Sequence, residues 1–471
     1  MTTQKPTLSI WSWLATGLAL LGCVHNPGIN RTQLAKLSDG ISWIEDDYAG
    51  ALLQAQGARK PILIEMWAPW CHSCLSMKQF ILNDPGLKPF AERFVWLAID
   101  TEKATNAPVL EKFPVQAWPT FLVVSSVDES IQAVQVGSES VSQFREFLGD
   151  GQSGHLDALA RGKLLAADDP LRWVRDGDRA CLAGDLEGAT EAYRRALAEA
   201  SSVWPRRAEL LSRSIYLLYQ TGRFGDCVQS ALDHLNELGL GPSAVDALAA
   251  AFECVGALPQ ADARRDTLAG RSIAMLTALT RDPSAPLSAD DRSEAFRLLR
   301  EILESRGERD RARSVALSQH DLLEQAAAKA GSPLAASTYN GPRAELALYL
   351  GRGEQIIQVL EASEKALPGQ YDPPFRQAWV QLQLGRPEAA LECARRALAL
   401  CQGPRTARIH ALIADIHRAR KDTDLELQAR KAALGVYTSL PKGQRRPIEE
   451  KRAREAIDAL LSLPAPGGIA P

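Results

Sequence analysis

The sequence predicts an α/β domain over residues 40–150, followed by an all-α solenoid over residues 166–463. In the first domain, short β-rich apolar runs alternate with segments of helical periodicity. After about residue 155 the strand signals vanish, and a pattern of glycine followed by small residues recurs. A chain of 471 residues, 46% hydrophobic and 24% charged, suits two or three globular units. The formal net charge of -3 and the lack of a Lys/Arg block argue against nucleic acid as a partner.

Residues 1–22 have the plan of a signal peptide, with one positive charge and an apolar run too short to span a membrane. The run ends in Leu20-Leu21-Gly22-Cys23, which resembles the bacterial lipoprotein signal. That resemblance implies a lipid on Cys23 and a periplasm-facing protein anchored in the cell envelope. Val24, in place of Asp, favours the outer membrane. The alternatives are an ordinary cleaved signal or a cytosolic chain with an apolar start, and residues 23–39 are expected to form a tether.

The α/β domain can be followed element by element. A short alternation of apolar and polar residues over 41–43 precedes an expected helix over 48–57. Buried strands are expected over 61–67, 94–100 and 121–124, with a helix ending near 113 between the second and third. A strand over 131–136 and an amphipathic helix from 141 to 148 complete the domain. This order predicts a mixed sheet with helices on both faces.

Two cysteines, Cys71 and Cys74, follow the strand over 61–67. Cys74, Met77 and Ile81 recur at helical spacing, so Cys71 is expected at the amino end of a helix. The amide groups and dipole of that end favour a thiolate. We therefore expect Cys71 to be an exposed nucleophile and Cys74 a more buried resolving thiol.

The segment resembles the thioredoxin superfamily, and most closely the carboxy-terminal periplasmic domain of thiol:disulfide interchange reductases. The resemblance is carried by the Trp67-Ala68-Pro69-Trp70-Cys71-His72-Ser73-Cys74 core, by Asn83-Asp84-Pro85, by Pro119 before a strand and by Gly137. It covers about a quarter of the chain. It implies dithiol-disulfide exchange without metal or cofactor, on protein substrates with disulfides, with electrons from a separate membrane thiol reductase. It also implies a cis Pro119 and a substrate-binding surface made of Trp70, Trp118, Pro119 and Thr120.

Glu65 occupies the position of the buried acid of thioredoxins, where a carboxylate can take the proton of the resolving thiol. The alternative is a Glu65 side chain that turns outward at a strand end. The pair His72-Ser73 and the Leu75 that follows leave the direction of electron flow open, with a lean towards reductase or isomerase. A zinc site would need two more ligands, and a purely structural disulfide is the other alternative for the cysteine pair.

The helical remainder is expected to begin after a Gly-rich linker over 151–165 and to end before a loose tail over 464–471. Gly184 and Gly385 are each followed at offsets of 5, 9, 12 and 13 by residues of the same kind. Weaker copies begin at Gly222, Gly256, Gly307, Gly351 and Lys421. The pattern resembles tetratricopeptide repeats, and implies a groove for extended peptides or partner helices.

Five further cysteines are expected to be inert core thiols: Cys181, Cys227, Cys254, Cys393 and Cys401. The whole sequence thus predicts an envelope thiol-disulfide oxidoreductase whose helical repeats recruit clients or partner proteins. The competing hypothesis is a non-catalytic envelope assembly scaffold in which the thioredoxin fold serves as a docking module.

Overall fold

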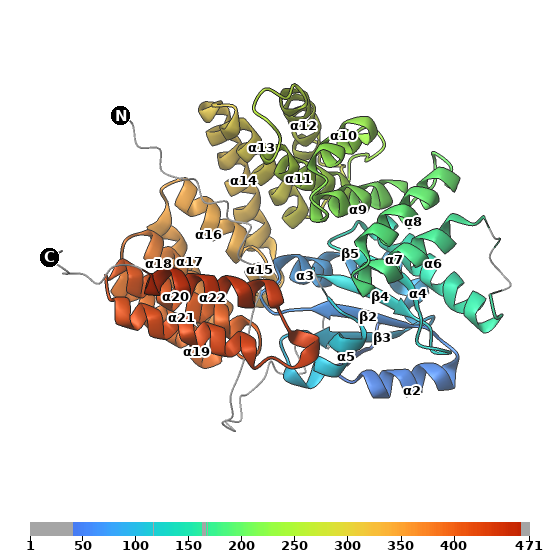
Figure 1. Ribbon diagram of the computed structural model, residues 1–471, viewed down its shortest axis with the longest axis horizontal. Helices are drawn as coiled ribbons and strands as arrows, with labels where there is room; N and C mark the ends of the chain where they lie inside the picture. The colour runs from blue at the N-terminus through green and yellow to red at the C-terminus, as the bar shows by residue number, and fades with distance from the viewer. Residues whose placement is uncertain (1–40, 116, 163–165, 167, 463–471) are drawn as a thin grey trace. The chain divides into compact units, whose positions relative to one another are not determined.

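A computed structural model describes residues 41–115, 117–162, 166 and 168–462 (Figure 1). The described chain divides into two compact units, one of residues 41–100 and 113–356 and the other of residues 101–112 and 357–462. The predicted signal peptide (1–22), tether (23–39) and tail (464–471) lie outside the described residues. No helix within the described ranges is long and apolar enough to cross a membrane.

The first unit contains a five-stranded mixed sheet. Helices follow the α/β part along the chain, as the sequence predicts. The strand order is β1-β3-β2-β4-β5, with β4 antiparallel to both of its neighbours and the remaining pairs parallel. The strands are β1 (Trp43–Glu45), β2 (Ile62–Trp67), β3 (Val95–Asp100), β4 (Thr120–Val124) and β5 (Ile131–Val136). Every residue of β2, β3 and β4 is buried, because these three strands occupy the middle of the sheet and are covered on both faces.

Helices connect these strands and follow the last of them, and an aromatic core packs on one face of the sheet. In this unit they are α2 (Tyr48–Ala58), α3 (His72–Ser76), a π-helical turn (Met77–Ile81), α4 (Lys88–Ala91) and α6 (Val141–Leu159). The core gathers Trp96, Phe121, Phe144 and Phe147, each at most 2% exposed. Phe121 of β4 and Phe144 of α6 meet edge to face at 5.0 Å, which fixes α6 against the sheet.

The Gly-rich segment predicted as part of a linker over 151–165 is helical as far as Leu159, so that prediction is wrong. Its glycines serve close packing. A Cβ on Gly151 would lie 2.5 Å from the Val123 side chain of β4. A Cβ on Gly154 would lie 2.7 Å from the Gln132 side chain of β5. Glycine is required there because the helix backbone approaches the sheet too closely for any larger residue.

Helical hairpins make up the rest of the described residues. The first unit continues with α7 (Pro170–Ala183), α8 (Leu186–Glu199), α9 (Arg207–Gln220), α10 (Phe224–His234), α11 (Pro242–Gly256), α12 (Arg264–Arg281), α13 (Ala289–Ser305), α14 (Arg309–Lys329), α15 (Pro333–Ser337) and α16 (Asn340–Tyr349). The chain then runs through α17 (Gly353–Ala366), α18 (Asp372–Gln383), α19 (Pro387–Leu400), α20 (Arg405–Ala419), α21 (Thr423–Thr438) and α22 (Pro447–Leu461). The predicted all-α region is therefore confirmed.

Six of the seven predicted repeat starts are turns between successive helices. Their φ angles are all positive, at Gly184, Gly222, Gly307, Gly351, Gly385 and Lys421. Glycine adopts this left-handed conformation without steric cost, which explains why it recurs at the end of one helix and before the next. Gly256 differs, because it is the last residue of α11. The small residues that follow Gly184 and Gly385 are buried, as the packing argument requires.

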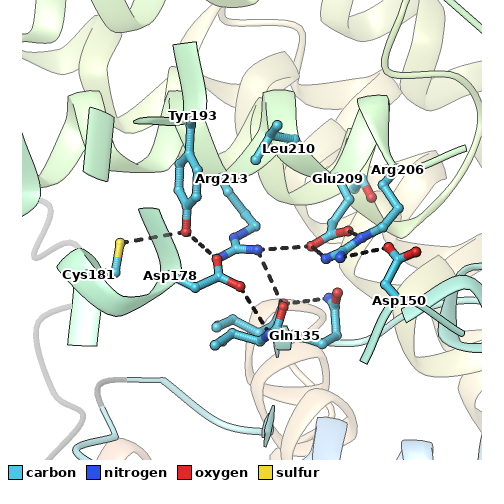
Figure 2. Close-up of polar contacts among 12 residues, drawn as sticks. Gln135, Asp150, Asp178, Cys181, Tyr193, Arg206, Glu209, Leu210 and Arg213 are labelled. Carbon is cyan, nitrogen blue, oxygen red and sulfur yellow. Dashed lines mark hydrogen bonds and ion pairs between the residues drawn. The ribbon is translucent and has the colours of Figure 1, made fainter. Parts of the chain in front are cut away.

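Charged side chains of the first hairpins pair with the edge of the sheet (Figure 2). The amide of Val134 in β5 donates to Asp178 at 3.1 Å, and its carbonyl accepts from Arg213 at 3.3 Å. Arg213 also contacts Asp178, Tyr193 and Glu209. An edge strand carries backbone groups that no other strand satisfies, so helices α7 and α9 supply their partners here.

Cysteines of the helical region are not all thiols. Cys227 of α10 and Cys254 of α11 form a disulfide, and both are fully buried. The prediction of inert thiols is wrong for this pair. The packing of α10 against α11 brings together two cysteines that are 27 residues apart in sequence. Cys181, Cys393 and Cys401 are free thiols, but only Cys393 is buried as a core residue.

The second unit brings an α/β segment together with the last helices. Residues 101–112, which include α5 (Ala107–Lys112), belong to it, so the domain predicted over 40–150 is not one continuous compact body. Gln444 donates to the carbonyls of Thr101 and Lys103 at 2.8 and 3.2 Å. The amide of Arg405 donates to Glu102 at 2.8 Å.

Candidate active site

Cys71 and Cys74 form a disulfide at the amino end of α3, directly after β2. Cys71 is the residue that caps α3, and its sulfur accepts a hydrogen bond from the Cys74 amide at 3.0 Å. An amide donor and a helix amino terminus both stabilise negative charge on that sulfur once the disulfide is reduced. The predicted position of Cys71 at the amino end of a helix is confirmed, and its thiolate character stays a prediction.

Both sulfurs are well covered in this disulfide form. Cys71 is 3% exposed and Cys74 is fully buried. The expectation that Cys71 is exposed is wrong here, because the tryptophans around it, Trp70 and Trp118 among them, pack over the cysteine pair. Cys74 is the more buried of the two, as expected.

The residues expected to bind substrate lie together beside the disulfide. The Trp118-Pro119 peptide bond is cis, which confirms the prediction. Trp70 and Trp118 are partly buried and meet edge to face at 5.4 Å. Thr120 is buried and donates to the Ala117 carbonyl at 2.7 Å, so its side chain faces the protein. Substrate binding by these residues stays a prediction.

Glu65 lies in the middle of β2 and is fully buried, which excludes the alternative of an outward side chain. Its nearest charged partner is Lys78, whose Nζ lies 3.4 Å from Glu65 Oε2. The same ammonium group lies 3.3 Å from the centre of the Trp67 ring. Lys78 is thus held by a carboxylate and by an aromatic face.

Burial changes the proton affinity of both partners. It raises the pKa of Glu65 above 4.5, although the positive charge of Lys78 opposes the change. It lowers the pKa of Lys78 below 10.5, although Glu65, Asp100 and Glu45 oppose that change. Within the described chain neither Glu65 oxygen accepts a hydrogen bond. Since the 3.4 Å separation is longer than a good hydrogen bond, we take burial to dominate at Glu65.

Two residues at the site escaped the sequence analysis. Lys78 was overlooked although it lies four residues after Cys74, on the face of the helix that carries Cys74. Asp290, whose carboxylate lies 2.8 Å from His72 Nδ1, is 218 residues away in sequence, and no local pattern could have identified it. The predicted lipidation site, Cys23, lies outside the described residues.

Comparison with known proteins agrees with this site. A family model described as thioredoxin-like matches residues 43–125. The thiol:disulfide interchange protein DsbD of Yersinia pestis (strain Pestoides F) is 31% identical over 100 residues, which are 21% of this chain and 16% of that protein. The DsbD of Pseudoalteromonas atlantica is 26% identical over 93 residues, which are 19% and 16% of the two chains.

The chain thus matches about a sixth of the length of these relatives. Among solved structures, a tetratricopeptide repeat protein from Parabacteroides merdae is similar with a TM-score of 0.40 and 12% identity. That similarity covers 62% of this chain and 99% of the other. Residues 43–125 are therefore a thioredoxin-like segment with a Cys-x-x-Cys pair, distantly similar to the carboxy-terminal domain of DsbD.

Proposed function

We propose that this protein is a thiol-disulfide oxidoreductase of the bacterial cell envelope, with a lean towards reductase or isomerase activity. The single observation that carries the proposal is the Cys71–Cys74 disulfide at the amino end of α3, which packs against Trp70 and Trp118. Each part has a chemical task in exchange, and the distant likeness to DsbD supports the same reaction class.

In the reduced enzyme, the Cys71 thiolate attacks a substrate disulfide, forms a mixed disulfide and releases one substrate thiolate. Cys74 then loses its proton to Glu65 and attacks the Cys71 sulfur. The Cys71–Cys74 bond forms, the mixed disulfide breaks, and the second substrate thiolate leaves. Two electrons have passed to the substrate, and a separate membrane thiol reductase restores the dithiol.

The full-length protein should reduce a protein disulfide such as that of insulin in the presence of a thiol donor. A Cys71→Ser variant should fall to background, because the thiolate that starts the reaction is missing. Cys181→Ser is the matched control, since Cys181 is a free, partly buried thiol outside the site, and it should keep full activity. Equal rates for the wild type and Cys71→Ser would rule the oxidoreductase out.

Export to the envelope is the second part of the proposal. The buried Cys227–Cys254 disulfide supports it, because such bonds persist in oxidising compartments. Lipid on Cys23 would then hold the protein at the membrane, and Val24 favours the outer one. Mass spectrometry of the amino-terminal peptide from cells tests this, and an unmodified Cys23 would contradict it.

The helical repeats are proposed to recruit client or partner proteins to the site. A non-catalytic assembly scaffold is the second candidate, and the 3% exposure of Cys71 favours it. The insulin assay separates the two, because a scaffold with an enclosed disulfide would show no turnover that depends on Cys71.

A further inference from the structure

Asp290, a residue of the helical region, contacts His72, which directly follows Cys71. Asp290 lies on α13, in the same compact unit as His72 of α3. Its two carboxylate oxygens lie 3.0 and 2.8 Å from His72 Nδ1. The side chain of Asp290 is 2% exposed, and that of His72 is 33% exposed.

The amino end of α13 makes two more contacts with the α/β part of the same unit, at Ser76 and at Ser138. Ser76 donates to Ser288 at 3.2 Å, and Ser138 donates to Asp291. Ser288 in turn caps α13 and bonds Asp291 in a capping box. The helix end that carries Asp290 is therefore held by its own capping box and by the contacts with Ser76 and Ser138.

The contact decides where His72 carries its protons. A carboxylate can only accept hydrogen bonds, so Nδ1 must be the donor and carry a hydrogen. The other ring nitrogen, Nε2, is then the one that gains or loses a proton. A negative charge at 2.8 Å favours the doubly protonated, positive ring. A buried carboxylate also needs a positive partner, and His72 is placed to be that partner.

Other titratable groups lie around Asp290 and His72. The dipole of α13 favours the negative charge of Asp290 in its first turn. One turn later, burial alone would raise the pKa of Glu294, but Arg297 and then His72 lower it below its usual value. Tyr339 is buried near the same group, and burial together with the charges of Asp290 and Asp291 raises its pKa.

We propose that Asp290 is a positioning residue for disulfide exchange, which holds His72 as an imidazolium beside Cys71 and thereby stabilises the Cys71 thiolate. The inference rests on the proposed function. When Cys71 attacks, its new bond to the substrate sulfur forms as the substrate disulfide breaks, and the electron pair leaves with the departing thiolate. His72 keeps its proton throughout and serves as countercharge. The helical repeats then help to set the redox potential of the site.

The test is the equilibrium of full-length protein with glutathione, followed by the state of Cys71 and Cys74. In Asp290→Asn the equilibrium constant for reduction should fall about tenfold, which corresponds to a potential about 30 mV lower. The same variant should require a higher pH for half-maximal alkylation of Cys71. Asp290→Glu keeps a carboxylate and should retain most of the wild-type potential.

A mutant cycle separates this role from a structural one. His72→Gln should lower the potential as Asp290→Asn does, and Asp290→Asn should add nothing in a His72→Gln background. Asp178→Asn is the matched control, because Asp178 is another buried aspartate that joins the helices to the sheet, through Val134 instead. It should leave the potential unchanged.

An unchanged or higher potential in Asp290→Asn would overturn the inference, as would an equal shift in Asp178→Asn. A wild-type potential in His72→Gln would do the same, even if Asp290→Asn fails to fold. These results leave the proposed function intact, since that fails only if wild-type turnover does not depend on Cys71.

Discussion

At the scale of single residues, the site depends on a buried acid and its cation. Glu65 is fully buried in β2, and Lys78 Nζ lies 3.4 Å from its Oε2. A buried pair at this spacing leaves the carboxyl with a raised pKa, because burial outweighs the attraction of the ammonium group. A carboxylate with a raised pKa is a stronger base, which suits the proposed transfer of a proton from Cys74 to Glu65.

Glu65→Gln tests that role, because an amide cannot accept the proton. Exchange should become about 100-fold slower, as is typical for loss of a general base. Wild-type rates should fall as pH drops through the raised pKa of Glu65, which lies above 4.5, whereas the variant should lack this acid limb. Glu92→Gln, at a side chain that is 94% exposed, is the control. Identical pH profiles for Glu65→Gln and wild type would refute a proton-transfer role.

The same pKa has a consequence for stability. The folded-state pKa is raised, so the unfolded chain releases this proton first as pH rises. The contribution of Glu65 to the free energy of unfolding is therefore largest below about pH 4.5 and declines as pH rises towards the folded value. Glu65→Gln should remove that decline.

At the scale of elements, glycines perform two different tasks. In the hairpin turns they adopt positive φ, and the repeats were recognisable from the sequence because this need recurs in each. In α6 they allow close packing, which the sequence alone presented as a flexible linker. The sequence shows glycine in both places. The difference is that the glycines of α6 pack against the β-sheet, which only the folded structure reveals.

Two glycines of α6 make a matched pair. Gly151→Ala should destabilise the protein by about 1–3 kcal/mol, because its Cβ would lie 2.5 Å from Val123. Nothing lies within 4 Å of a Cβ on Gly149, so Gly149→Ala should stabilise the helix by about 0.5–1 kcal/mol. Urea unfolding followed by circular dichroism measures both. A stabilising Gly151→Ala would mean that α6 is not seated on the sheet as described.

At the scale of the whole molecule, chain order and compact units do not coincide. Residues 101–112 are part of an α/β sequence pattern, yet they belong to the unit of residues 357–462. Gly443 shows how tightly they pack, since a Cβ there would lie 2.1 Å from the Ala107 carbonyl. A fragment that ends at residue 150 would therefore lack the partners of this segment.

The Cys227–Cys254 disulfide is the covalent link of the helical region. Replacing both residues by alanine should cost about 3 kcal/mol, because the bond restricts the unfolded chain across 27 positions. Urea unfolding of the variant and of the wild type should show the difference, and a strong reductant should remove it. Cys181→Ala should behave as wild type in both conditions. Alkylation of Cys227 and Cys254 in protein from cells would contradict the bond.

The secondary-structure elements and the Cys-x-x-Cys pair could be predicted from the sequence. Every predicted strand of the sheet is present, Cys71 and Cys74 form a disulfide, and the Trp118-Pro119 bond is cis. These signals are local, since period-two and period-3.6 patterns and a short motif act within about ten residues. Three features were visible only in the folded chain: the burial of Cys71, the pairing of Lys78 with Glu65 and that of Asp290 with His72. Such contacts depend on where distant segments pack, because burial and charge act through space, and no periodicity in the chain encodes them.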